Sequence, residues 1–231
     1  MKGVFDVIVA VISEKGGTGK TTIAIHLAGW RTAAGSDVML VDSDRQGTAT
    51  YWVEVRNDLK LPTPSTVQSF QRSLRRSVLD LTRHYGELIV DVGAGDGVGI
   101  ESILRVADLA IVPLQPNELD IWTVGLLDEL AGDARAVNEK LDVKAVLNRA
   151  PTHHANTDAQ AAQTALEQCQ YIEATNLTIR ERSSIRRSVL AGKLVNEWQP
   201  RDPKGEQELG AVYELTYGVT VSGEMFGSVA V

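Results

Sequence analysis

The sequence predicts an α/β fold in which a mostly parallel, twisted sheet carries helices on both faces. Apolar, β-branched runs of strand length alternate with longer segments of helical periodicity along the chain. The first run, "VFDVIVAVI" at 4–12, is continuously apolar apart from Asp6, as a strand buried on both faces is. The 231 residues contain no low-complexity linker and no repeat, so we expect one domain over 1–231, with 218–231 a candidate flexible tail.

The first part of the chain alternates regularly. The strand at 4–12 leads through glycines into a helix at 20–34, which Gly35 is expected to close as a C-cap. A second apolar strand at 37–44 ends in two aspartates, and "TYWVEVRNDL" at 50–59 reads as a helix. This β-α-β-α order is typical of parallel sheets, whose strands are joined by helical crossovers.

The alternation continues to the C-terminal part. A turn and short strand at 62–67 precede a helix at 69–86, whose apolar residues recur at helical spacing. The strand "ELIVDVGAGDG" at 87–97 runs into glycines. Beyond it we expect strands at 107–116, 143–150 and 177–179, and helices at 117–137, 157–169, 183–192 and 203–217.

Composition excludes several classes of site. The net charge of −7 does not favour nucleic-acid binding, which would need a local basic patch. A single cysteine, Cys169, excludes a disulfide framework and a multi-cysteine metal site within one chain, and we expect it to be a buried small hydrophobe. His153 and His154 have no third ligand at suitable spacing, so a surface loop is expected there.

Hydropathy gives no sign of a membrane anchor. No apolar stretch approaches the roughly 20 residues of a membrane span, and the C-terminal end lacks the basic residues of an amphipathic membrane helix. The apolar N-terminus leads straight into a glycine-rich loop rather than to a cleavage site. We therefore expect a cytoplasmic protein with no membrane partner.

The segment "SEKGGTGKTT" at 13–22 has the strand–loop–helix context of a phosphate-binding loop. Its glycines let the backbone turn N–H groups toward phosphate oxygens, and the following helix directs its N-terminus at the anion. Lys20 would neutralise the β- and γ-phosphates, Thr21 would offer its hydroxyl to Mg²⁺, and Thr22 would cap the helix. The candidate nucleotide-binding residues here are Gly16, Gly17, Thr18, Gly19, Lys20, Thr21 and Thr22.

The loop departs from the common pattern G-x-x-x-x-G-K-S/T, because Glu14 replaces the first glycine and a second lysine, Lys15, follows. "KGGTGKTT" resembles the deviant Walker A motif, KGGxGK(S/T), of the ParA/MinD family of P-loop ATPases. The resemblance covers about residues 5–215 and implies a P-loop NTPase fold with ATP and Mg²⁺ as ligands. It also implies that Lys15 reaches across a dimer interface to the phosphates of the partner's nucleotide, so that Lys15 and Lys20 are both catalytic.

Two further motifs resemble family elements that end in carboxylates. "VDSDRQG" is similar to D-x-D-P-Q-G, which implies that Asp42 helps to position the Mg²⁺ shell and that Asp44, a catalytic residue, orients the attacking water. Arg45 stands where the family usually has proline. "LIVDVGAG" resembles Walker B, which implies that Asp91 acts on Mg²⁺ through a water and that Gly93–Gly95 is a switch sensing the γ-phosphate.

Two more segments are assigned to the part of the site that binds the nucleotide base, by resemblance alone. "VPLQPNELD" at 112–120 resembles a proline-bearing loop of small ParA proteins near the adenine and the dimer seam. "VLNRAP" resembles the segment that carries the base-contacting residues, here Asn148 and Arg149.

Basic residues gather in two places. The segment at 179–193 resembles the C-terminal region that ParA proteins use for non-specific DNA binding, and its basic residues are Arg180, Arg182, Arg186, Arg187 and Lys193. A second cluster, Arg72, Arg75, Arg76 and Arg83, either extends this patch or solvates a helix.

The resemblance implies a small ParA-type ATPase that dimerises on ATP and hydrolyses it weakly under partner stimulation. Such a protein binds DNA non-specifically, associates with the nucleoid, and segregates plasmid or chromosomal DNA with a ParB-like centromere-binding protein. Alternatives are a positioning ATPase for another cargo, such as a protein compartment or chemoreceptor cluster, a DNA-transfer helper, or a MinD-like regulator. An iron-protein reductase would need paired cysteines, and a synthetase-type ligase would lack Lys15.

Overall fold

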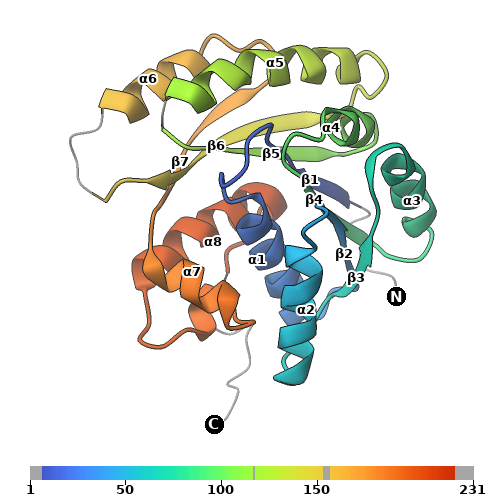
Figure 1. Cartoon of the computed structure of the whole chain (residues 1–231), viewed down its shortest axis with the longest axis vertical. Helices are drawn as coiled ribbons and strands as arrows, with labels where there is room; N and C mark the ends of the chain where they lie inside the picture. The colour runs from blue at the N-terminus through green and yellow to red at the C-terminus, as the bar shows by residue number, and fades with distance from the viewer. Residues whose placement is uncertain (1–6, 117, 153–156, 222–231) are drawn as a thin grey trace.

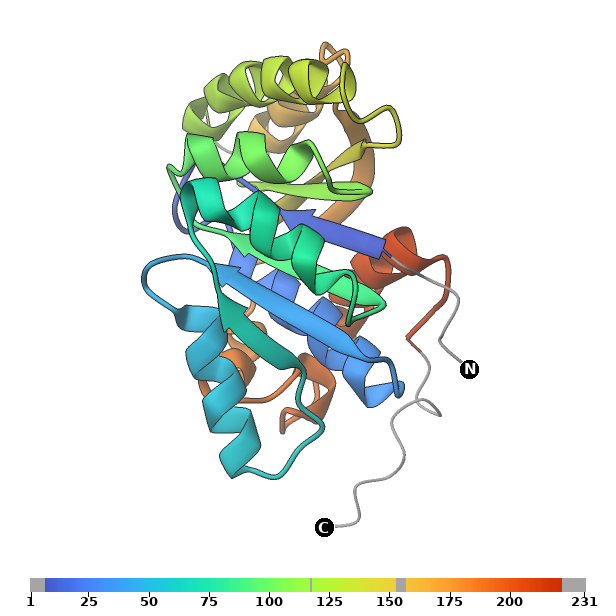
Figure 2. The same ribbon diagram turned by 90° about the vertical axis from the view of Figure 1, so that its right-hand side faces the viewer.

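In the part of the chain that the computed structural model describes, residues 7–116, 118–152 and 157–221, seven parallel strands form one sheet (Figure 1). Their order is β3-β2-β4-β1-β5-β6-β7, and Figure 2 shows them side by side from β7 to β3. The strands are β1 Val7–Val11, β2 Val38–Ser43, β3 Ser65–Gln68, β4 Glu87–Val92, β5 Leu109–Leu114, β6 Asp142–Ala150 and β7 Glu173–Arg180. The expected parallel α/β fold is confirmed.

Helices cover both faces of this sheet, as expected (Figure 1). Alternate residues of β1 separate the two cores, since Ile8 and Ala10 pack with α3, α4, α5 and α6, whereas Val9 and Val11 pack with α1, α2, α7 and α8. The helices are α1 Lys20–Ala33, α2 Thr48–Asp58, α3 Leu74–Leu81, α4 Gly97–Leu104, α5 Glu118–Arg135, α6 Thr157–Leu166, α7 Ser183–Leu190 and α8 Pro203–Tyr217, with 3₁₀ turns η1 Gln71–Ser73 and η2 Val195–Glu197. No helix in these ranges is both long and apolar enough to cross a bilayer.

One helix was not anticipated. The sequence suggested that the strand at 87–97 simply runs into glycines, but the chain forms α4 directly after it. The carboxylate of Asp96 caps the new helix by accepting a hydrogen bond from the Gly99 amide at 2.9 Å. Ile100, Ile103 and Leu104 are fully buried on its inner face, so packing stabilises a segment whose glycines favour helix weakly.

Three other boundaries differ from expectation. The helix expected at 69–86 is instead η1 followed by the shorter α3, and Gln71, at the start of η1, has a positive φ of 50° that a regular helix does not allow. Strand β7 is longer than the expected 177–179 and joins β6 with irregular register. Gly35 follows the actual C-cap of α1, Ala34, and takes the left-handed conformation with φ 89°.

Some sequence expectations concern residues outside the described ranges, among them residues 4–6 of the first strand, His153–His154, and 222–231 of the tail. Cys169 lies within the described ranges and is half-buried against the core beneath α5 and α6. It is thus less buried than expected, and burial and the nearby Asp128 raise the pKa of its thiol to about 11.

Polar groups fasten the connection between α7 and α8 to α1 and α2. The guanidinium of Arg56, on α2, is fully buried and donates to both oxygens of Glu197 at 2.7 Å, and also to the carbonyls of Pro62 and Gly192. On α1, the Trp30 indole N–H donates to Asn196 at 2.9 Å. These bonds fix the end of α7 against the helices that follow β1 and β2.

His26, also on α1, joins this network as a neutral imidazole. Its Nδ1 donates to the carbonyl of Thr22 at 2.7 Å, and its Nε2 accepts from the amide of Val195 at 3.1 Å. Burial lowers the pKa of His26 to about 4, which keeps Nε2 available as an acceptor near neutral pH. The first turn of α1 is thereby connected directly to η2.

We expect Arg56→Ala to lower the free energy of unfolding by about 3 kcal/mol, because removing one partner of a buried ion pair leaves the other uncompensated. Arg76→Ala is the matched control, since Arg76 and Asp80 form an exposed i,i+4 pair at 3.9 Å that contributes at most about 0.5 kcal/mol. Urea denaturation measures both values. Equal effects of the two substitutions would contradict a fastening role for Arg56.

Candidate functional site

The loop between β1 and α1 has the backbone shape of an anion site. Gly17 and Gly19 have φ of 79° and 93°, a left-handed conformation in which successive N–H groups can face one ligand. Helix α1 begins at Lys20 with Gly19 as its N-cap, and no side chain caps it. The expected capping role of Thr22 is therefore wrong, because Thr22 already lies within the first turn. An N-terminus without a side-chain cap keeps its amides available to an anion.

The two reactive groups of the loop are held by neighbouring residues. The ammonium of Lys20, which is 6% exposed, donates to the carbonyl of Lys15 at 2.9 Å. The hydroxyl of Thr21 donates to Oδ2 of Asp91 at 2.7 Å. These contacts bring the start of α1 against the end of β4, so Thr21 and Asp91 form one pair.

Asp91 has the properties of a carboxylate that supports a cation. It is 1% exposed, and its Oδ1 has no hydrogen-bond partner in the described structure. Burial raises its pKa to about 7 against the opposing effect of the Thr21 hydrogen bond. A divalent cation near Thr21 would compensate this buried carboxylate, so the donor set fits Mg²⁺. Within the described ranges no group of three or more His, Cys, Asp or Glu side chains is placed to hold a metal.

The two aspartates at the end of β2 differ in environment. Asp42 is fully buried, and its oxygens accept hydrogen bonds from the Asp44 amide at 3.1 Å and from the amide and hydroxyl of Thr50 at 2.8 and 2.9 Å. It therefore anchors the following turn and the start of α2. Its place in the Mg²⁺ shell stays a prediction.

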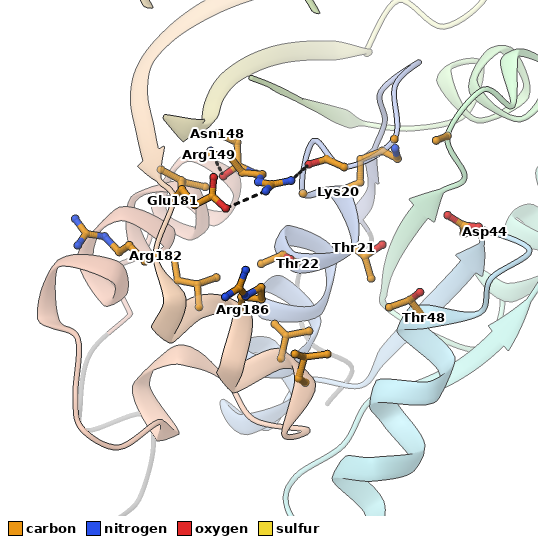
Figure 3. Close-up of a pocket in the computed structure, with 18 of the residues that line it drawn as sticks. Lys20, Thr21, Thr22, Asp44, Thr48, Asn148, Arg149, Glu181, Arg182 and Arg186 are labelled. Atoms are coloured by element: carbon orange, nitrogen blue, oxygen red, sulfur yellow. Dashed lines mark hydrogen bonds and ion pairs between the residues drawn. The ribbon is translucent and has the colours of Figure 1, made fainter. Parts of the chain in front are cut away.

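Asp44 is partly exposed and lies at the cleft beside the phosphate loop (Figure 3). Its Oδ1 accepts the Gln46 amide at 2.9 Å, and its carbonyl accepts the Gly47 amide at 2.9 Å. These two bonds close the turn around Arg45, so the turn is held without the proline usual at that position.

The glycine-rich turn after β4 contacts both preceding loops. The Gly95 amide donates to the Glu14 carbonyl at 3.0 Å. A Cβ on Gly93 would lie 3.0 Å from the Ser43 carbonyl, so only glycine allows this approach without a shift. The expected switch segment is thus in contact with the phosphate loop and with the Asp44 turn.

Residues from the ends of β5 and β6 close over the phosphate loop. The Asn148 amide donates to the Thr18 carbonyl at 2.6 Å, while Arg149 and Gln115 each donate to the Gly17 carbonyl at 2.8 Å. Arg149 also pairs with Glu181 at 2.9 Å. Gln115 belongs to the expected proline-bearing loop, but the side chains at 117–122 lie outside the described residues.

A cleft of about 420 Å³ collects most of the predicted site (Figure 3). The residues predicted for nucleotide binding or catalysis that line it are Gly16, Gly17, Gly19, Lys20, Thr21, Thr22, Asp44, Asn148 and Arg149. Three residues predicted to bind DNA also line it, Arg180, Arg182 and Arg186. Lys15, Thr18, Asp42 and Asp91 are not among the lining residues. The lining residues that the sequence did not single out include Gln46, Thr48, Glu181 and Ile185. Gln46 belongs to the motif "VDSDRQG" itself and Thr48 follows it directly, so both had a local signal.

The basic residues of the segment at 179–193 lie in different environments. Both oxygens of Glu208 accept hydrogen bonds from Arg182, at 2.6 and 2.9 Å, and Arg180 pairs with the same carboxylate at 3.8 Å. Figure 3 shows Arg182 directed away from the phosphate loop. Arg186 and Arg187 are exposed, and Lys193 is half-buried.

The second basic cluster does not adjoin the first. Arg72, Arg75, Arg76 and Arg83 are all exposed in the region of η1 and α3. Leu74 and Val78 of α3 pack on the face of the sheet opposite to Ile185 of α7. The interpretation that this cluster extends the patch of α7 is therefore disfavoured.

Comparisons with known proteins agree with this geometry. Residues 9–230 match the model of the "CobQ/CobB/MinD/ParA nucleotide binding domain" family. The chain is 28% identical over 205 residues to maintenance of carboxysome distribution protein A of Halothiobacillus neapolitanus, covering 88% of this chain and 93% of that one. It is 29% identical over 142 residues to protein ParA of Rhizobium radiobacter, covering 58% and 60%.

A solved structure of a Cyanothece McdA variant in complex with ATP has a similar fold. The TM-score is 0.70 at 17% sequence identity, covering 94% of this chain and 98% of that one. Together with the match over 9–230, the glycine loop and the paired strand-end aspartates identify the chain as a member of the CobQ/CobB/MinD/ParA family of nucleotide-binding domains.

Proposed function

We propose that this protein is a ParA-type ATPase that binds ATP with Mg²⁺, dimerises in that state and hydrolyses ATP slowly until a partner protein stimulates it. One observation carries the proposal. The uncapped start of α1, with Lys20 and Thr21, meets Asp44 at one cleft, and the buried carboxylate of Asp91 supports Thr21 from behind. A phosphate site, a cation site and a water-orienting carboxylate are what phosphoryl transfer to water requires.

Each side chain has a definite task in this proposal. Lys20 and the loop amides bind the phosphates, while Thr21 would hold the cation and Asp91 would act on it through a water. When bound, Mg²⁺ would neutralise charge at the phosphates. Asp44, held by its own turn, orients the attacking water, and Asn148 and Arg149 contact the base.

The biological output that we propose is the positioning of a cargo. The first candidate is plasmid or chromosomal DNA, segregated with a ParB-like partner while the ATPase is bound non-specifically to the nucleoid. The second candidate is a protein compartment. The observation in its favour is that the relative that covers 88% of this chain is named for carboxysome distribution. The site chemistry is the same for both, so the partner protein decides the cargo. A MinD-like regulator has no observation of its own in its favour.

The site assignment predicts different defects for two substitutions. Lys20→Ala should abolish ATP binding by removing the main phosphate cation, whereas Asp44→Ala should retain binding and lose turnover about 100-fold or more. Calorimetric ATP affinity and phosphate release measure the two steps separately. Lys140→Ala, at an exposed position, is the control and should leave both unchanged. Wild-type hydrolysis by either test variant would refute the role assigned to that residue.

Lys15 is proposed to act on the nucleotide of a second copy, because "KGGTGKTT" resembles the deviant Walker A motif, in which the extra lysine acts across a dimer interface. We therefore expect a non-hydrolysable ATP analogue to convert monomer to dimer in light scattering, whereas ADP should not. Lys15→Gln should lower hydrolysis strongly, because charge at the transferred phosphoryl group is lost. The proposal fails if this variant dimerises and hydrolyses ATP at wild-type levels.

DNA binding is proposed for the outer side of α7 and should need ATP, ignore sequence and weaken steeply with salt, since counterion release drives it. Because Arg180 and Arg182 are paired with Glu208, Arg187 and Lys193 are the better test residues. Arg187→Glu with Lys193→Glu should abolish DNA binding in a gel shift and preserve ATP affinity.

The matched control for this test is Arg72→Glu with Arg76→Glu, which lies toward the other face of the sheet and should leave DNA binding unchanged. If the control loses DNA binding and the test variant retains it, the surface belongs to the region of α3. If the wild-type protein binds no DNA in any nucleotide state, the nucleoid model is wrong.

A further inference from the structure

The arginines that line the nucleotide cleft are not equivalent. Four arginines line it, and three of them have carboxylate partners: Arg149 pairs with Glu181, and Arg180 and Arg182 share Glu208. Arg186 lines the same cleft, but among the residues that the structure describes its guanidinium has neither an ion pair nor a side-chain hydrogen bond. Among the four cleft arginines, the one without a carboxylate partner in the described part of the chain therefore belongs to α7.

The position of Arg186 on its helix directs it toward the phosphate end of the cleft. Ile185 packs into the core beneath α7, and Val189, one turn after Ile185, lines the cleft with Arg186. Figure 3 shows the Arg186 side chain leaving α7 on the side of Thr22, in the first turn of α1. Asn148 and Arg149, the proposed base contacts, lie at the end of β6 above it in the same view.

The first turn of α1 and the guanidinium of Arg186 suit the same ligand. The first turn of α1 presents amides with no side-chain cap, and a guanidinium fork can donate two hydrogen bonds to phosphate oxygens. An exposed arginine without a carboxylate partner has no internal ion pair to give up on binding such an anion. A base or ribose would offer it no comparable charge.

We propose that Arg186 binds the phosphate groups of the nucleotide in this cleft and thus connects α7 to nucleotide occupancy. This inference rests on the proposed function, because it concerns the same site. The next residue, Arg187, is exposed and is not among the cleft residues. One helix then carries a nucleotide contact and, at the adjacent position, a candidate DNA contact. The competing assignment is that both arginines belong to the DNA surface.

The test is a comparison of Arg186→Ala with its neighbour Arg187→Ala. Calorimetry with ATP and Mg²⁺ should show affinity weakened about tenfold or more by Arg186→Ala, the loss of a charge-assisted hydrogen bond, and changed less than about twofold by Arg187→Ala. Arg186→Lys should restore part of the loss. Adenosine, which has no phosphates, should bind all four proteins equally, and thermal melting should be the same for all four.

DNA binding at saturating ATP supplies the second arm. There Arg186→Ala should bind DNA like wild type, and Arg187→Ala should bind more weakly. If Arg186→Ala has wild-type ATP affinity, or if its adenosine affinity falls as far as its ATP affinity, the phosphate contact is overturned. If the wild-type protein binds no ATP, the proposed function fails as well, so the two failures are distinguishable.

Discussion

The register of β2 against β4 is the constraint on which the site depends. These parallel strands pair so that Asp42 lies opposite Asp91, with Leu40 opposite Ile89 in the core below. Because side chains alternate along a strand, a slip of one residue would turn one aspartate to the other face of the sheet. Asp42 would then lose its bonds to Thr50, and α2 would lose its anchor. The apolar residues that stabilise the sheet thus also align the carboxylates.

Local patterns in the sequence were sufficient for most strands and helices and for the phosphate loop, though not for the length of β7, because continuous apolar runs and glycine turns act over a few residues. They were insufficient for α4, because its glycines have low helix propensity and the helix is stabilised by burying Ile100 and Ile103 in the core. The bonds that define the cleft are also long-range. Arg149 meets Glu181 across 32 residues, and Arg182 meets Glu208 across 26, so neither pairing is visible in a window of sequence. For this reason the arginines of the segment at 179–193 could not be told apart in the sequence, although they lie in different environments.

The outer side of α7 and the nucleotide cleft depend on the same buried hydrogen bonds. Arg56 and His26 hold the chain after α7 to the helices that follow β2 and β1, the same strands that carry Asp44 and the phosphate loop. The chain after α7 is therefore held by hydrogen bonds to the two helices that begin at the site loops. The exposed Arg186 and Arg187 of α7 take no part in these bonds.

The bond from the Lys20 ammonium to the Lys15 carbonyl has a consequence for how the loop meets an anion. An ammonium carries three N–H donors, so Lys20 can keep this bond and still direct its other donors at a phosphate. The carbonyl thus orients the ammonium at the start of α1 before any ligand is present. Because the acceptor is a backbone oxygen, a change of the Lys15 side chain leaves it in place.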